Sequence, residues 1–355
     1  MRTSKRASMT SGRSWVLTKD LLMRRHLRFQ PSGHEFDAAE GETILAAALR
    51  QGYKILHACD NGVCHICAAR LLKGNVAGGV GESGRRRLGA DEVLLCKATP
   101  EGDCEFELRR IWGPNELETK TLAFQIKAVT ALSDDVYQVQ LLAPAGALPE
   151  FFAGQYLELL APGVEAAFFS IANAPGTREV ELHIQVHQES RSALAIYQYL
   201  TSESVVRARL PLGKCFISGV PDMDVSLIAA GTGFAQIKSI VEYLLAQGFE
   251  RKLSIYWGVR QSQEMYARAL SEAWAERHEN VSFTPVMADN RDNEWQGHHA
   301  ELVRAVLAER RHWDNSLVYV SGSPTMVYTA MDALAPLGLP GEQFFSDVLE
   351  YAPRG

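Results

Sequence analysis

The sequence contains no uninterrupted apolar run long enough to cross a bilayer, and its first 28 residues lack the apolar core of a secretory signal. It also lacks the basic excess typical of nucleic-acid-binding proteins, because its formal net charge is −6. No internal repeat is visible along the chain. We therefore expect a cytoplasmic protein of two or three domains, with no membrane insertion and no nucleic-acid partner.

Cysteine is scarce, with 6 residues in 355, which disfavours the disulfide framework of a small secreted domain. A zinc site with two Cys-x-x-Cys pairs is also disfavoured, because only Cys64 and Cys67 have that spacing. Cys59, Cys64 and Cys67 instead have four and then two residues between them, and Cys96 follows at a distance. This spacing is typical of a plant-type [2Fe-2S] site, in which two bridged irons need four thiolates. We predict these four cysteines as the metal ligands.

A small α+β domain is expected around this loop, over residues 25–109. Two short strands flank a turn at 31–33, a helix covers 43–49, and strands follow at 93–96 and 104–108. Gly62 allows the backbone to approach the inorganic sulfides, while Cys104 and Cys215 are expected to be small buried residues. His65 is expected either to donate a hydrogen bond to a cluster sulfur or to face solvent. The order of elements resembles the β-grasp fold of plant-type ferredoxins.

Two polar segments flank or interrupt this domain. Residues 1–24 are basic and are expected to form a disordered tail, with a transit peptide or a translation start at Met23 as alternatives. The basic run 85–87 is interpreted either as a docking point near the cluster or as a solvated charge run. Residues 110–119 contain Gly113 and Pro114 and are predicted to be a linker.

The rest of the chain changes character twice. Residues 120–220 contain short alternating strands, such as 180–186, and one helix at 193–200, which indicates an antiparallel β-barrel. Residues 221–355 alternate strands with helices, which indicates a doubly wound α/β domain with a parallel sheet. The predicted fold class is therefore multidomain, with an α+β, a β-barrel and an α/β part.

Two loops in the last domain have the position of nucleotide-binding turns. Gly231-Thr232-Gly233 follows a buried strand and opens a helix, so its amides and the helix dipole can meet a pyrophosphate. Ser321-Gly322-Ser323-Pro324-Thr325-Met326 follows a later strand. Ligands of such sheets bind beyond the carboxyl ends of the strands, so both loops are expected to face one crevice.

Residues 120–355 resemble the ferredoxin–NADP reductase superfamily through three stretches, 231–235, 256–260 and 345–347. Together with the ferredoxin-like part, residues 25–355 resemble the fused reductases that serve oxygenases or CDP-6-deoxyglucoseen synthesis. The last two domains also resemble bacterial NAD(P)H:flavin oxidoreductases. The resemblance implies a flavin-binding barrel, an NAD(P)-binding domain, and FAD or FMN together with NADH or NADPH as cofactors.

The flavin motif of the superfamily, Arg-x-Tyr-Ser, is matched by Ala167-Phe168-Phe169-Ser170. The resemblance implies that Phe169 covers the isoalloxazine and that Ser170 lies near flavin N5. Ala167 replaces an arginine that pairs with the flavin phosphate, a contact worth about 1.5–3 kcal/mol, so flavin retention is expected to be roughly ten- to hundredfold weaker. Arg191 is a candidate substitute charge, and an exposed loop arginine is the alternative.

The remaining residues implied by the resemblance fall into two groups. Ser170, Ser321 and Asp347 are the predicted catalytic residues, with a simple capping role as the alternative for Asp347. Arg260 is compatible with either a 2′-phosphate or an adenine stack, so the choice between NADH and NADPH stays open. The predicted cofactor-binding residues are Phe168, Phe169, Ser170, Ile171, His183, Ile184, Gly231, Thr232, Gly233, Arg260, Ser321, Gly322 and Met326.

These predictions combine into an electron-transfer enzyme that passes electrons from NAD(P)H through flavin to the cluster and then to a partner oxygenase or sugar dehydrase. Flavin is needed because nicotinamide transfers two electrons together and the cluster accepts one. A second hypothesis is an NAD(P)H:flavin oxidoreductase that uses flavin as a diffusible substrate. A third is a redox sensor or electron carrier without turnover.

Overall fold

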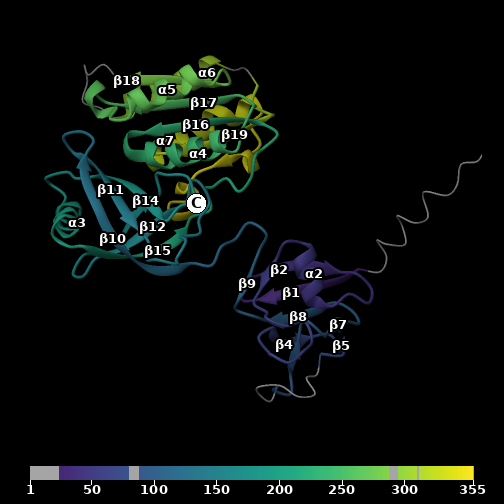
Figure 1. Ribbon diagram of the computed structural model, residues 1–355. Helices are drawn as coiled ribbons and strands as arrows, with labels where there is room; N and C mark the ends of the chain where they lie inside the picture. Colours follow the sequence, from purple (N-terminus) through teal and green to yellow (C-terminus); the bar gives the residue numbers. More distant parts are fainter. Residues whose placement is uncertain (1–23, 80–87, 288–294, 310–311, 355) are drawn as a thin grey trace, which may run out of the picture. The chain divides into compact units, whose positions relative to one another are not determined.

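The computed structural model describes residues 24–79, 88–287, 295–309 and 312–354 (Figure 1). The chain divides into two compact units, Met1–Glu118 and Thr119–Gly355. Residues 1–23 of the predicted tail and the basic run 85–87 lie outside the described residues. In the described part of the chain, no helix has both the length and the apolar character needed to cross a membrane.

The first unit is a five-stranded sheet in the order β2-β1-β8-β4-β6, packed against helix α2. Phe29 of β1 is fully buried and stacks on Phe36 and Phe106, with ring centroids 5.1 and 5.3 Å apart. The Thr43 side chain accepts the Ala46 N–H and so begins α2. The elements are β1 (Arg25–Gln30), β2 (His34–Ala38), α2 (Ile44–Arg50), β3 (Lys54–Ile55), β4 (Ala68–Lys73), β5 (Val76–Ala77), β6 (Glu92–Leu94), β7 (Thr99–Pro100), β8 (Cys104–Glu107) and β9 (Ile111–Trp112).

Two details of this unit differ from the sequence-based expectation. The strand predicted at 93–96 is β6 and ends at Leu94, so Cys96 lies in the following turn, where Ala98 N–H donates to the Leu94 carbonyl. The segment predicted as a linker begins inside the unit, because β9 pairs antiparallel with β3. Backbone pairing between segments so far apart leaves no local signal in the sequence.

The second unit begins with a six-stranded antiparallel sheet in the order β13-β12-β15-β10-β11-β14. A bridge between Ile171 and Leu182 joins the end of β13 to β14, which closes the sheet into the predicted barrel. Leu157, Leu159 and Leu182 point into the barrel core. The elements are β10 (Lys120–Ala131), β11 (Val136–Leu142), β12 (Tyr156–Leu160), β13 (Ala167–Ser170), β14 (Glu179–Gln185), α3 (Arg191–Ser202) and β15 (Val205–Leu212).

A five-stranded parallel sheet in the order β18-β17-β16-β19-β20 completes the second unit. The strand order reverses between β16 and β19, the strands that precede the two predicted nucleotide loops. The strands are β16 (Asp224–Ala230), β17 (Leu253–Val259), β18 (Val281–Met287), β19 (Ser316–Ser321) and β20 (Phe344–Phe345). The helices are η1 (Gly231–Gly233), α4 (Phe234–Ala246), η2 (Ser262–Glu264), α5 (Arg268–Arg277), α6 (Trp295–Glu309), α7 (Pro324–Leu334), η3 (Ala335–Leu337), η4 (Gly341–Gln343) and α8 (Val348–Tyr351).

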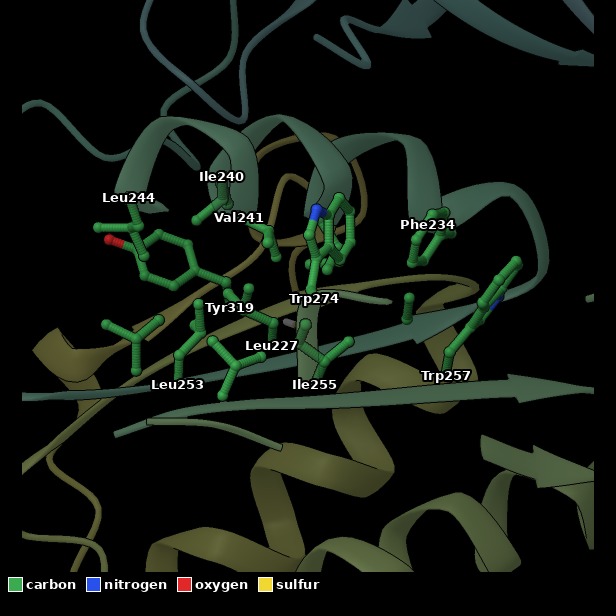
Figure 2. Packing of buried hydrophobic residues seen from close by; sticks show 14 of the residues in the cluster. Leu227, Phe234, Ile240, Val241, Leu244, Leu253, Ile255, Trp257, Trp274 and Tyr319 are labelled. Carbon is green, nitrogen blue, oxygen red and sulfur yellow. The ribbon is translucent and has the colours of Figure 1, made fainter. Parts of the chain in front are cut away.

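Helices cover both faces of this sheet, as the buried and mainly apolar strands β16, β17 and β19 require. Figure 2 shows the face under α4, where Phe234, Val241 and Leu244 point toward the strands. On the opposite face, α6 and α7 pack against Ile228 and Val320. The predicted fold class, with its α+β, β-barrel and α/β parts, is confirmed.

Candidate functional site

The loop 59–67 and the turn after β6 bring the four predicted cluster cysteines together in two pairs. Cys59 and Cys64 are neighbours, as are Cys67 and Cys96. In the described ranges, no three His, Cys, Asp or Glu side chains are arranged to hold one metal ion. Two pairs of thiolates suit two bridged irons, each with two protein ligands, better than one tetrahedral zinc.

Backbone amides of the loop are directed at these sulfurs. The Cys64 N–H donates to Cys59 Sγ at 3.2 Å. Hydrogen bonds from the Cys64 thiol and amide, and from the Asn61 and Val63 amides, lower the pKa of Cys59 to about 7. Burial and the adjacent Cys67 thiol raise the pKa of Cys96 to about 12, although the Gly62 amide opposes this shift. At Cys59 the loop amides therefore stabilise negatively charged sulfur, as a thiolate ligand requires, whereas the buried Cys96 favours its neutral thiol when no metal is bound.

His65 lies between the ligand positions and is buried, with 6% of its surface exposed. The predicted alternative of a solvent-facing histidine is therefore wrong. Its backbone is left-handed, with φ of 57°, and neither ring nitrogen has a hydrogen-bond partner in the described structure. A hydrogen bond from His65 to a cluster sulfur stays a prediction.

The two predicted nucleotide loops lie against each other at the carboxyl ends of β16 and β19. A Cβ atom on Gly233 would lie 2.4 Å from the Ser321 carbonyl oxygen, so only glycine permits this approach. The Trp257 indole N–H donates to the Gly231 carbonyl at 2.9 Å and holds the first loop. Trp257 is fully buried and stacks on Phe234, with centroids 3.9 Å apart.

Beside these loops lies a cavity of about 550 Å³, which we call the Ser321 cavity. The barrel and the parallel-sheet part both contribute to it, so it lies at the junction between them. The three predicted catalytic residues, Ser170, Ser321 and Asp347, line it together with the predicted cofactor-binding residues Phe168 and Gly322. The full lining is Tyr156, Phe168, Ser170, Gln236, Val320, Ser321, Gly322, Ser346, Asp347, Val348 and Tyr351.

The ring that lines this cavity from β13 is Phe168, not Phe169. Side chains alternate along a strand, so Phe168 and Ser170 share the outer face of the barrel while Phe169 packs against its core. Phe168 is 56% exposed and meets Tyr156 edge to face at 5.9 Å between centroids. The expectation that Phe169 covers a flavin ring does not match this geometry.

Asp347 is the strongly perturbed acid of the Ser321 cavity. Burial raises the pKa of Asp347 to about 7, although hydrogen bonds from the Gln236 side chain and the Cys215 amide partly oppose the shift. The Gln236 Nε2–Asp347 Oδ2 distance is 2.8 Å. A carboxyl with this pKa can exchange a proton near neutral pH beside Ser170 and Ser321.

A second hollow, the Arg260 pocket, lies on the other side of the glycine loop. It contains the predicted residues Gly231, Thr232 and Arg260, and the barrel contributes Asp135 and Gln185. The full lining is Asp135, Val136, Gln185, Ala230, Gly231, Thr232, Gly258, Val259, Arg260, Glu264, Tyr266, Val286 and Leu302.

Six predicted cofactor-binding residues line neither hollow, namely Phe169, Ile171, His183, Ile184, Gly233 and Met326. Ile171 and Ile184 are buried in the barrel core, and Met326 packs on Gly322 beneath the second loop. His183 is bonded at both ring nitrogens, with Nδ1 3.0 Å from the Tyr266 hydroxyl and Nε2 2.8 Å from Glu181. Of these residues, only His183 links the barrel to the nucleotide-binding part, through Tyr266, whereas Ile171, Ile184 and Met326 pack within separate cores.

Sequence reasoning missed the residues that complete the hollows from other elements. Tyr156, Gln236 and Tyr351 line the Ser321 cavity, and Trp257 anchors the glycine loop. Only Trp257 lies in a stretch that the sequence had singled out, 256–260, but nothing in that stretch indicates its bond to Gly231.

The cysteine loop and the nucleotide loops both lie in segments of the chain that match known domain families. The 2Fe-2S iron-sulfur cluster binding domain matches residues 27–101, and the oxidoreductase NAD-binding domain matches residues 227–332. The chain is 31% identical to protein RfbI of Salmonella typhimurium, over 92% of this chain and 96% of that protein.

Two further relatives have names that state a reaction. The CDP-6-deoxy-L-threo-D-glycero-4-hexulose-3-dehydrase reductase of Yersinia pestis is 29% identical, over 92% of this chain and 98% of that protein. The phenol 2-monooxygenase reductase component DmpP of Pseudomonas sp. strain CF600 is 31% identical, over 88% of this chain and 90% of that protein. Both matches agree with the resemblance inferred from the sequence.

Proposed function

The chain belongs to the family of NAD(P)H-dependent reductases that join a 2Fe-2S ferredoxin domain to an NAD-binding domain, and we propose that it delivers electrons to a separate cytoplasmic protein. Electrons pass from NAD(P)H through flavin to the 2Fe-2S cluster. The final acceptor is an oxygenase or a sugar dehydrase. One observation carries the proposal. The same chain contains a group of four neighbouring thiols and a cavity that is lined by both the barrel and the second nucleotide loop.

Each site has a defined part in this function. The cofactors, FAD and the cluster, supply the change from two-electron to one-electron transfer when bound. Cys59, Cys64, Cys67 and Cys96 hold the cluster, and the loop amides stabilise their negative charge. The glycine loop receives the pyrophosphate of the dinucleotide at the N-terminal end of α4.

The Ser321 cavity orients the reacting rings and manages the accompanying proton. Phe168 and Tyr156 offer apolar surface on the barrel side, and the Ser170 and Ser321 hydroxyls offer hydrogen bonds from opposite elements. Asp347 exchanges the proton, because its pKa of about 7 leaves both protonation states populated near neutral pH.

The two classes of acceptor come from the relatives. One relative is the reductase of a CDP-hexulose dehydrase, and another is the reductase component of a phenol monooxygenase. The two relatives have similar sequence identities to this chain, which favours neither class. Purified dehydrases and oxygenases should therefore both be tested as electron acceptors.

One observation favours a second function, reduction of diffusible flavin. Ala167 stands where the superfamily has the arginine that pairs with the flavin phosphate. Arg191, at the first position of α3, is exposed. The flavin content of the purified protein separates the two functions, because about one flavin per chain supports the internal relay and substoichiometric flavin supports the diffusible substrate.

Alanine substitution of any one cluster cysteine tests the relay. The variant Cys64→Ala should lose NAD(P)H-dependent reduction of cytochrome c, a one-electron acceptor, because the cluster cannot form with three thiolates. Reduction of bound flavin by NAD(P)H should survive, because it takes place in the second unit. Iron content, the visible spectrum and both activities are measured on one sample.

Cys104→Ala is the matched control for this test. Cys104 is buried in the same unit, and its thiol donates to the Asn75 carbonyl at 3.3 Å, outside the cysteine loop. It should retain iron and cytochrome c reduction. Loss of flavin reduction in a folded Cys64→Ala protein, or cytochrome c reduction that survives without iron, would count against the relay.

A further inference from the structure

The Arg260 pocket lies where the adenosine half of a dinucleotide would be bound. The Ser321 cavity lies at the ends of β16 and β19 and faces the barrel residues Phe168 and Ser170. The Arg260 pocket lies at the ends of β16 and β17, on the other side of Gly231. If the nicotinamide reacts in the Ser321 cavity and the pyrophosphate binds at the glycine loop, the adenosine ribose of the same dinucleotide falls in the Arg260 pocket.

The charges around this pocket are mostly negative. Asp135 and Glu264 contribute carboxylates, and Arg260 is the one guanidinium among the lining residues. Arg260 is already engaged, because its Nε lies 3.5 Å from Glu264 Oε1 and its backbone N–H donates to Glu264 Oε2 at 2.9 Å. The pocket therefore has one more carboxylate than it has guanidinium groups.

Asp135 is held in place at the pocket wall. Its Oδ2 accepts a hydrogen bond from the Gln185 side chain at 2.7 Å, and its Oδ1 accepts one from the Ser133 hydroxyl at 3.2 Å. His187 lies 3.7 Å from Oδ2 and is half exposed. Because Asp135 comes from the barrel and not from the NAD-binding domain, the order of elements in the nucleotide fold alone does not predict it.

We propose that Asp135 and Glu264 make this reductase selective for NADH over NADPH, by accepting a ribose hydroxyl and repelling a 2′-phosphate. The proposal rests on the proposed function, since it concerns the dinucleotide that supplies the electrons. A ribose hydroxyl can donate to either carboxylate, whereas a phosphate dianion would meet the excess negative charge of Asp135 and an arginine that is already paired with Glu264. The class of substrate is therefore the dinucleotide without a 2′-phosphate.

The test compares two binding probes and two substrates. Calorimetry measures the affinity of the intact protein for ADP-ribose and for 2′-phospho-ADP-ribose, and steady-state assays measure kcat/KM for NADH and NADPH. The native protein should prefer the unphosphorylated member of each pair by about tenfold or more. Asp135→Asn should reduce both preferences by about three- to tenfold, because asparagine keeps the acceptor for Gln185 but removes the charge.

Glu264→Gln and Asp134→Asn complete the comparison. Glu264→Gln should reduce the preference at least as much as Asp135→Asn, because it also releases Arg260 from its partner. Asp134 is the adjacent, exposed acid and does not line the pocket, so Asp134→Asn should leave both ratios unchanged. Two results would overturn the proposal. One is tighter binding of 2′-phospho-ADP-ribose than of ADP-ribose by the native protein, and the other is an Asp135→Asn protein whose preference for the unphosphorylated compounds equals that of the Asp134→Asn protein.

The two readouts separate this proposal from the proposed function. Selective binding of ADP-ribose without oxidation of either dinucleotide would support the selectivity and contradict the reductase function. Oxidation of both dinucleotides with equal kcat/KM and equal probe affinities would support the reductase and overturn the selectivity.

Discussion

The environment of the Asp347 carboxyl strongly changes its acidity. It accepts a hydrogen bond from Gln236, at 2.8 Å, and a longer one from the Cys215 amide, at 3.4 Å. The nearby Glu350 adds a like charge that raises its pKa further. These contacts do not offset the loss of hydration, so Asp347 is a proton-exchanging group in a cavity shared with Ser170 and Ser321.

Asp347→Asn should remove a pH dependence of stability. The folded protein holds this proton up to about pH 7, whereas the unfolded chain releases it near the ordinary pKa of 3.8. The stability that protonated Asp347 contributes is therefore fully present below the unfolded pKa and is lost as the pH rises through about 7. At about pH 8, Asp347→Asn should raise the free energy of unfolding by on the order of 2–4 kcal/mol, measured by urea denaturation.

Glu350→Gln serves as the control for this variant, because Glu350 is exposed and lies on α8, the short helix that begins directly after Asp347. It should change the slope of stability against pH only slightly. The pH profile of kcat for NAD(P)H oxidation should also lose its limb near pH 7 in Asp347→Asn but not in Glu350→Gln. An unchanged profile in Asp347→Asn would exclude this residue from proton exchange.

At the level of elements, the position of the glycine loop depends on β17, the next strand in the chain after the loop. β17 supplies Trp257, whose indole donates to the Gly231 carbonyl, and the ring supports Phe234 at the start of α4. Trp257→Phe keeps the stacking surface but removes this hydrogen bond. We expect KM for the dinucleotide to rise roughly two- to tenfold, which corresponds to about 0.5–1.5 kcal/mol, with kcat little changed.

Trp274→Phe is the matched control for Trp257→Phe. Trp274 of α5 also stacks on Phe234, with centroids 6.3 Å apart, and belongs to the same core cluster. Both variants lose similar buried area, so both should lower the free energy of unfolding by comparable amounts. Only Trp257→Phe should raise KM, and equal KM values in the two variants would mean that the loop does not need this bond.

Periodicity within one element was the most reliable guide from sequence to structure. The alternation at 180–186 predicts β14 (Glu179–Gln185), and the buried run before Gly231 predicts β16. The same rule, applied to residues 167–170, would have placed Phe168 and Ser170 on one face of β13, but the motif resemblance drew attention to Phe169. The alternation thus accounts for which of the two predicted rings lines the Ser321 cavity, which the motif does not indicate.

Contacts between elements could not be predicted, because they depend on how distant segments pack. His183 has the alternation of a residue in a half-buried strand, yet its partners are Glu181 in the same strand and Tyr266, 83 positions away. Lys238 of α4 extends this network, with Nζ 3.3 Å from Glu181 and 2.7 Å from Glu242. The i,i+4 spacing of Lys238 and Glu242 is visible in the sequence, but no spacing signals the links from Lys238 to Glu181 or from His183 to Tyr266.

At the scale of the whole molecule, the two units have separate cores. The first unit buries Phe29, Phe106 and the apolar face of α2, and that cluster contains no residue from the described part of the second unit. The barrel and the parallel sheet, by contrast, are joined in one unit by contacts such as His183–Tyr266. The chemistry divides in the same place, with the thiols in one unit and the nucleotide loops in the other.

Separating the chain between Glu118 and Thr119 should therefore preserve each half of the chemistry and interrupt the transfer between them. The fragment 119–355 should oxidise NAD(P)H with ferricyanide as acceptor, and the fragment 1–118 should bind iron with the spectrum of a [2Fe-2S] protein. Reduction of cytochrome c by the mixed fragments at about 1 μM should be about 10²- to 10³-fold slower than in the intact chain, because a short tether supplies a millimolar effective concentration.

The concentration dependence of this reaction decides between a tethered relay and a stable association of the two units. If the tether alone brings the units together, the rate per chain in the mixture should rise in proportion to concentration, whereas the intact protein shows a constant rate per chain. A mixture that matches the intact protein at about 1 μM would mean that the units bind each other tightly without the covalent link. In that case the connection at 118–119 would contribute little to electron transfer, and the surface of the first unit would itself have to recognise the second.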